Sequence, residues 1–201
     1  PKVLEARAAL AVHSAHWLAT RIGLWKMLEP WQRFAMIVAA AGLHCTGGTA
    51  GIFEEDCLVP RIAATRLVLQ VLDKTELALQ GWGSSMRRLV CEAMVRALPK
   101  SMLEDARWLR VQLGRDDELV ERKQPAVQST LVTLVVAAAD FAYLALPPAM
   151  HQPWAKLCQE EVASTLAMPG MNPTFDVAAW MRGLLHVVVL PVYESLGACD
   201  G

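Results

Sequence analysis

The pattern of apolar and polar positions along the chain predicts helices and no strands. No stretch shows a sustained alternation of apolar and polar residues, and good helix formers such as Ala, Leu, Met, Arg, Glu and Gln dominate. Proline and glycine interrupt the apolar stretches, chiefly at Pro30, Gly47-Gly48, Pro99 and Pro147-Pro148. The pattern therefore predicts an all-α fold, with helices over residues 4–27, 31–43, 59–72, 74–98, 100–113, 126–146, 152–166 and 175–196.

Length and composition fit one domain. The 201 residues are 54% hydrophobic and 19% charged, enough to bury a substantial core. No internal repeat or domain boundary is evident, and the charged stretch 114–123, GRDDELVERK, suits a solvated turn or a short exposed helix. We expect residues 1–201 to form a single helical domain. Because the first residue is Pro1, we expect a processed chain or a fragment of a longer one.

Charge and cysteine usage exclude several classes of function. The net charge is −1 and basic residues are dispersed, whereas a nucleic-acid surface requires clustered basic charge. The five cysteines show no Cys-x-x-Cys spacing, which argues against a zinc finger and a disulfide framework. We expect no nucleic-acid partner and an intracellular, reducing compartment, with the cytoplasm favoured over an organelle.

Two apolar stretches, residues 34–53 and 129–146, raise the question of a membrane span. The first contains His44 and four glycines between positions 42 and 51, and the second contains Asp140 near its centre. A charge at mid-bilayer costs about 2.5–3.5 kcal/mol on insertion scales. Both stretches are therefore predicted to be buried core helices, and membrane contact is expected only through an assembly.

Three predicted helices each carry polar groups in an apolar context. They contain His13 and His16, His44, and Asp140. A buried carboxylate among Val, Ala and Leu requires a cation, a hydrogen-bond donor or a metal. Two histidines and a carboxylate from three helices would suit a zinc or other divalent site. The structural alternative gives each group a backbone or side-chain partner, and the residues alone leave both possibilities open.

The order of these motifs resembles that of the catalytic domain of class I cyclic-nucleotide phosphodiesterases. That family has a His-Asn-x-x-His-Ala-x-Asp-Val helix, an apolar helix ending in His-Asp, and a later apolar helix with His-x-Ala-Asp-Leu. Here HSAHW at 13–17, VAAAGLHC at 38–45 and VVAAADFAYLALP at 135–147 follow in the same order. Further matches are Trp154 with the Glu160-Glu161 pair, AMPGMNPTFD at 167–176, and WMRGLLHVVVLP at 180–191. The resemblance implies a compact multi-helix bundle of the HD type.

The resemblance also implies a metal site that has lost part of its chemistry. It places His13, His44 and Asp140 on three metal-ligand positions and Cys45 on the fourth, so the implied cofactor is at most one divalent metal, zinc or magnesium. The general-acid histidine of the family, four residues before the first metal histidine, falls on Ala9. The second Asp-His pair of the family's metal loop falls on Gly47 and Gly48. General-acid catalysis contributes about 10²–10⁴-fold in typical enzymes.

The purine pocket of the resembled family is altered as well. Met181 stands at the glutamine position and Leu184 at the clamping phenylalanine position, so paired hydrogen bonds to a base edge and an aromatic stack are both lost.

These departures predict a pseudoenzyme, kept for binding a protein partner or helices of its parent chain. One alternative is a metal-binding hydrolase of the same family with residual phosphodiester activity. Another, from a different class, is an unrelated helical subunit of a membrane-associated complex, which the apolar excess and seven tryptophans would suit.

Overall fold

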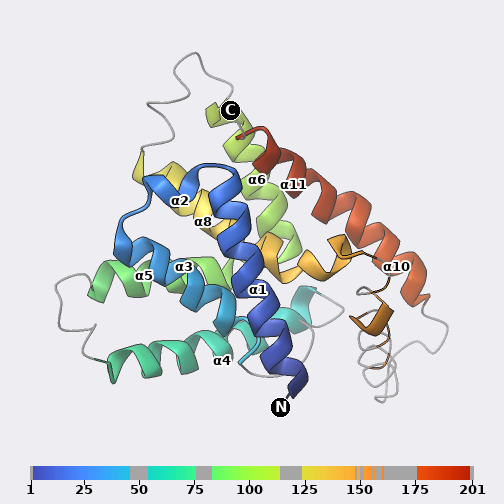
Figure 1. Ribbon diagram of the computed structural model, residues 1–201, viewed down its shortest axis with the longest axis horizontal. Coiled ribbons are helices and arrows are strands. Elements are labelled where there is room, and N and C mark those ends of the chain that lie inside the picture. The colour runs from blue at the N-terminus through green and yellow to red at the C-terminus, as the bar shows by residue number, and fades with distance from the viewer. Residues whose placement is uncertain are drawn as a thin grey trace.

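The computed structural model describes residues 2–45, 54–75, 83–113, 124–147, 149, 152–154, 156, 160 and 176–199. Every regular element within these residues is helical, and they contain no strand, which confirms the predicted all-α class. The helices form a compact bundle, with the ends of the described chain on opposite sides (Figure 1).

The first predicted helix, 4–27, is wrong as one continuous helix. It is divided into α1 (Lys2–Arg21) and α2 (Leu24–Met27), with Gly23 between them at φ 74°. Glycine adopts this left-handed conformation without a Cβ clash, so the chain turns there. The next helix, α3 (Pro30–Gly42), begins with a capping box in which Glu29 and Gln32 satisfy each other's backbone N–H groups.

The middle of the chain forms α4 (Glu54–Asp73), α5 (Gly83–Val95) and α6 (Pro99–Leu113). The predicted helix 59–72 lies within α4, and the predicted helix 100–113 matches α6. The predicted helix 74–98 is wrong at both ends, because residues 74–75 form a turn after α4 and residues 96–98 separate α5 from α6. Proline at the first turn of α6 lacks only an N–H that would have no partner within the helix.

The later helices are α8 (Pro125–Asp140), the 3₁₀ turn η2 (Ala142–Ala145), α10 (Val177–Leu184), the π-helical turn η3 (Leu185–Val189) and α11 (Leu190–Gly197). The predicted helix 126–146 thus changes from α to 3₁₀ after Asp140. The predicted helix 175–196 is continuous through its π turn, which precedes Pro191, a residue without a backbone N–H. The predicted helix 152–166 lies largely outside the described residues.

Helix α8 is the centre of the core. Every residue from Leu131 to Ala139 is buried, and α1, α3, α5, α6 and α11 pack around α8 (Figure 1). Gly42 permits a close helix approach, since a Cβ there would lie 2.6 Å from Val68 Cγ2. None of the described helices is long and apolar enough to cross a membrane. The apolar stretches around Met36 and Val135 are instead buried against other helices, as predicted.

Candidate functional site

The candidate site is a buried ion cluster at the C-terminal end of α8. The apolar run of α8 carries Asp140 to the point where α4 and the end of α3 meet it. Arg61 of α4 donates a hydrogen bond from Nη2 to Asp140 Oδ2 at 2.6 Å. His44, just after α3, has its Nε2 3.3 Å from Asp140 Oδ1. Both carboxylate oxygens therefore face protein nitrogen atoms.

Electrostatics keep the Asp140 carboxylate ionised. Burial favours the neutral acid, but the charge of Arg61, the charge of His44, the Arg61 hydrogen bond and the charge of Arg7 outweigh it and hold the pKa of Asp140 below its ordinary value. The Asp140 side chain is 13% exposed and that of Arg61 5%, so their attraction is only weakly screened by solvent. The carboxylate is thus compensated by cations that the chain itself supplies.

Arg61 is fixed in place by its helix. It is 4% exposed, and the Thr65 hydroxyl, one turn later, donates to the Arg61 carbonyl at 2.7 Å. The Nε of Arg61 is buried without a hydrogen-bond partner in the described structure. Because such a group costs free energy when its charge is unpaired, the contact with Asp140 carries much of the compensation for burying Arg61.

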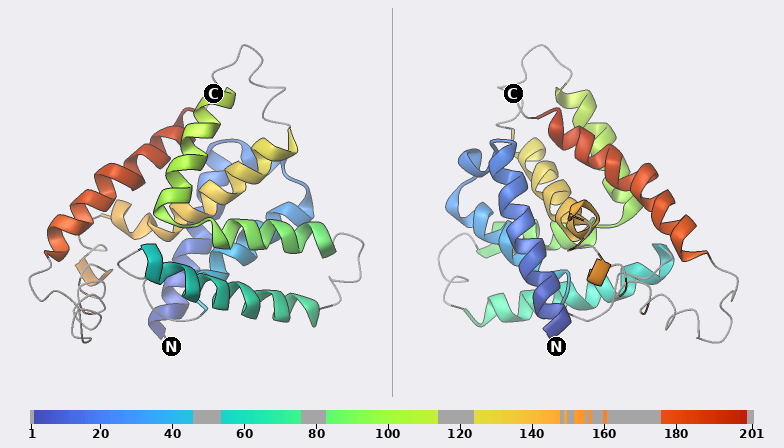
Figure 2. Two further views of the ribbon diagram at one scale, coloured as in Figure 1. Left: turned by 180° about the vertical axis from the view of Figure 1, so that it is seen from behind. Right: turned by 45° about the vertical axis from the view of Figure 1, so that its right-hand side comes forward.

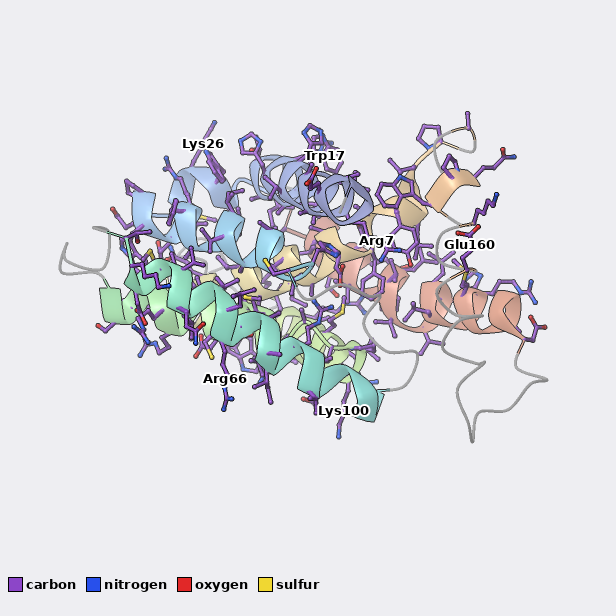
Figure 3. The ribbon with its side chains drawn as sticks, turned by 90° about the horizontal axis from the view of Figure 1, so that it is seen from below. Arg7, Trp17, Lys26, Arg66, Lys100 and Glu160 are labelled. Carbon is purple, nitrogen blue, oxygen red and sulfur yellow. The ribbon has the colours of Figure 1, made fainter. Side chains whose placement is uncertain are left out.

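The second cation near Asp140 comes from α1. Arg7 is 7% exposed, and its guanidinium carbon also lies 6.0 Å from the ring centroid of Trp154. Figure 3 shows Arg7 directed into the bundle, whereas Trp17 of the same helix points away from it. Arg7 and Arg61 are the residues that sequence reasoning missed. The sequence signal for them is the buried carboxylate itself, which requires a cation, together with arginines that fall on the apolar faces of their helices.

The prediction that His13 joins His44 and Asp140 is wrong. The buried face of α1 is formed by residues at four- and three-residue spacing, and His13 is exposed on the opposite face. His16 is exposed as well, with its ring in an edge-to-face contact with Trp25 at a centroid distance of 4.5 Å. The buried face of α1 includes Arg7, Ala11, Ala15, Leu18 and Ile22.

Cys45 does not complete a metal site either. The residue is exposed, its Sγ lies 4.0 Å from the Ala41 carbonyl oxygen, and partial burial of the thiol raises its pKa. The loop positions Gly47 and Gly48 lie outside the described residues. Within the part of the chain that is described, no three His, Cys, Asp or Glu side chains come together in a way that could hold a metal ion.

The two residues predicted to line a ligand pocket lie on α10. Met181 is half-buried, and Leu184 packs against the hydrophobic core. Leu184 is thus placed as a packing residue, and a role for either side chain in binding a ligand stays a prediction. Ala9, the position expected for the general acid, is exposed on α1 on the same side as His13.

No protein-family model and no curated protein sequence matches this chain.

Proposed function

We propose that this chain is a phosphodiesterase-like helical domain without catalytic activity, retained for binding or assembly. The observation that carries the proposal is the engagement of both Asp140 oxygens by Arg61 and His44. In the resembled family this carboxylate would ligate a metal. Here a guanidinium stands where the metal's positive charge would be needed, so the buried acid requires no added cation.

The orientation of α1 supports the same proposal. Ala9 and His13, the positions that the resemblance gives to the general acid and the first metal histidine, are both exposed on the face of α1 opposite to its buried residues. An alanine cannot act as a general acid, and an exposed His13 on that face supplies no ligand beside Asp140.

A divalent metal therefore fits the described residues poorly. Asp140 would have to exchange its Arg61 contact for a metal bond, leaving a buried guanidinium without its partner. His44 and Asp140 would supply two ligands, whereas metal sites in proteins usually draw three or four from the chain.

Exposed apolar residues on α4 support a binding role rather than catalysis. Val59 is 72% exposed, Val71 56%, Leu67 44% and Ile62 39%. Three of them, Val59, Ile62 and Leu67, line a surface groove of about 430 Å³. Apolar residues clustered on one face are typical of surfaces that contact another protein.

The test is metal content together with turnover. The purified chain is analysed for bound metal and assayed for hydrolysis of cyclic AMP and cyclic GMP with added Mg²⁺, Mn²⁺ and Zn²⁺. We expect no stoichiometric metal and no metal-dependent turnover. His44→Ala is compared with His186→Ala, an exposed histidine on the π turn. Turnover lost in His44→Ala but kept in His186→Ala would contradict the proposal and favour the residual hydrolase.

A further inference from the structure

A second polar site lies between α5, α6 and the first half of α8. It is a pocket of about 460 Å³, within the range of about 300–1,000 Å³ common for small-molecule sites. Its α8 residues run from Pro125 to Thr133, about two helical turns before Asp140. The left view of Figure 2 shows α5 and α6 on the near side, with α8 beside them. The pocket is therefore separate from the Asp140 cluster.

One ion pair in the pocket wall is satisfied within the protein. Arg96 donates from Nε to Asp105 Oδ2 at 3.0 Å and from Nη2 to Asp105 Oδ1 at 2.5 Å. This two-point contact, together with the charges of Glu104 and Glu92, raises the pKa of Arg96 against the opposing effect of burial. The pair fixes the end of α5 against α6 and leaves little charge for a ligand.

The other two charged residues are available. Arg88 and Glu92 both line the pocket, one turn apart on α5. The Ser129 hydroxyl donates to Glu92 Oε2 at 2.8 Å, which orients the carboxylate. Among the residues that the structure describes, none hydrogen-bonds Glu92 Oε1 and none forms an ion pair with Arg88. The pocket thus offers a ligand one cation, Arg88, and one anion, Glu92, on neighbouring turns of α5.

An aromatic side chain and a hydroxyl-bearing residue complete the pocket. Trp108 of α6 lines it and is 38% exposed, so its ring is accessible to a ligand. Thr133 of α8 also lines it and is 3% exposed.

We propose that this pocket binds a small zwitterion of the α-amino-acid class with a planar side chain. The ligand's carboxylate pairs with Arg88, its ammonium with Glu92, and its ring packs against Trp108. A zwitterion brings an opposite charge to both Arg88 and Glu92, whereas a simple anion or cation pairs with one of them and places a like charge near the other. This assignment does not depend on the loss of catalysis proposed above.

The test uses L-phenylalanine and two truncated analogues, 3-phenylpropionate and phenethylamine. Binding to the whole chain is measured by ligand-observed NMR and calorimetry. We expect phenylalanine to bind about tenfold or more tightly than either analogue, as expected for a charge-assisted contact. Arg88→Gln should weaken phenylalanine binding and leave phenethylamine unchanged. Glu92→Gln should weaken phenylalanine and phenethylamine binding and leave 3-phenylpropionate unchanged.

The matched control is Arg66→Gln, which removes an exposed arginine of α4 outside this pocket. It should leave all three affinities as in the wild type. The proposal is overturned if the wild type binds none of the probes, if it binds all three equally, or if Arg88→Gln and Glu92→Gln behave like Arg66→Gln.

Discussion

The charged groups beside the two ends of α8 differ in burial and in pairing. At the C-terminal end, Asp140 is compensated by Arg61 and His44. Towards the N-terminal end, Arg88 and Glu92 lie beside a pocket and make no ion pair with each other. One charge cluster is closed by the protein itself, and the other is open. This contrast indicates that the former can contribute to stability and the latter to binding.

The largest expected effect on stability comes from removing the buried negative charge of Asp140. Asp140→Asn removes the anion and leaves Arg61 charged and buried, so the free energy of unfolding should fall by about 3–5 kcal/mol. The measurement is urea denaturation at pH 7. The control is Asp73→Asn, whose partner Arg87 is exposed, and which should cost about 1 kcal/mol or less. Equal losses of unfolding free energy in Asp140→Asn and Asp73→Asn would contradict the stronger role assigned to the buried ion pair.

Protonation of Asp140 at low pH should have the same effect without a mutation. Because the folded-state pKa of Asp140 lies below its ordinary value of 3.8, its contribution to stability is complete above that pH and is lost as the pH falls through the folded pKa. The difference in unfolding free energy between wild type and Asp140→Asn should therefore shrink as the pH falls below about pH 4. A difference that grew towards low pH would mean that the sign assigned to Asp140 is wrong.

The smallest effect on stability is expected at the open end. Arg88 is exposed and forms no ion pair within the described structure, so Arg88→Gln should change the free energy of unfolding by less than about 0.5 kcal/mol. Thermal and urea denaturation of this variant beside the wild type measure the effect. A loss comparable to that of Asp140→Asn would show that Arg88 has a structural role and would remove the distinction between the two ends.

Much of the helical fold could be predicted from the sequence, because apolar runs bounded by proline and glycine determine where helices begin and end. The boundaries of α3 and α6 were close, since Pro30 and Pro99 mark their first turns. The break at Gly23 was missed because the residues on both sides favour helix, and only the left-handed backbone at that glycine ends α1.

The candidate site could be predicted only in part. The proximity of His44 and Asp140 followed from the order of the motifs, and the structure places them 3.3 Å apart. His13 matches the resembled motif by residue type but lies on the exposed face of α1. The buried face includes the small residues Ala11 and Ala15, which mark it only weakly in the sequence. The contact of Arg61 with Asp140 spans 79 positions in sequence and depends on how α4 packs, which local pattern does not determine.

The most direct test of the central claim asks which cation compensates Asp140. The free energy of unfolding of wild type and of Asp140→Asn is measured at pH 7 in excess EDTA and again with added Zn²⁺ or Mn²⁺. If Arg61 supplies the compensating charge, the difference between the two proteins is the same in both conditions. If EDTA alone lowers the wild type to the level of the variant, and metal restores it, a bound ion holds the carboxylate and the account is contradicted.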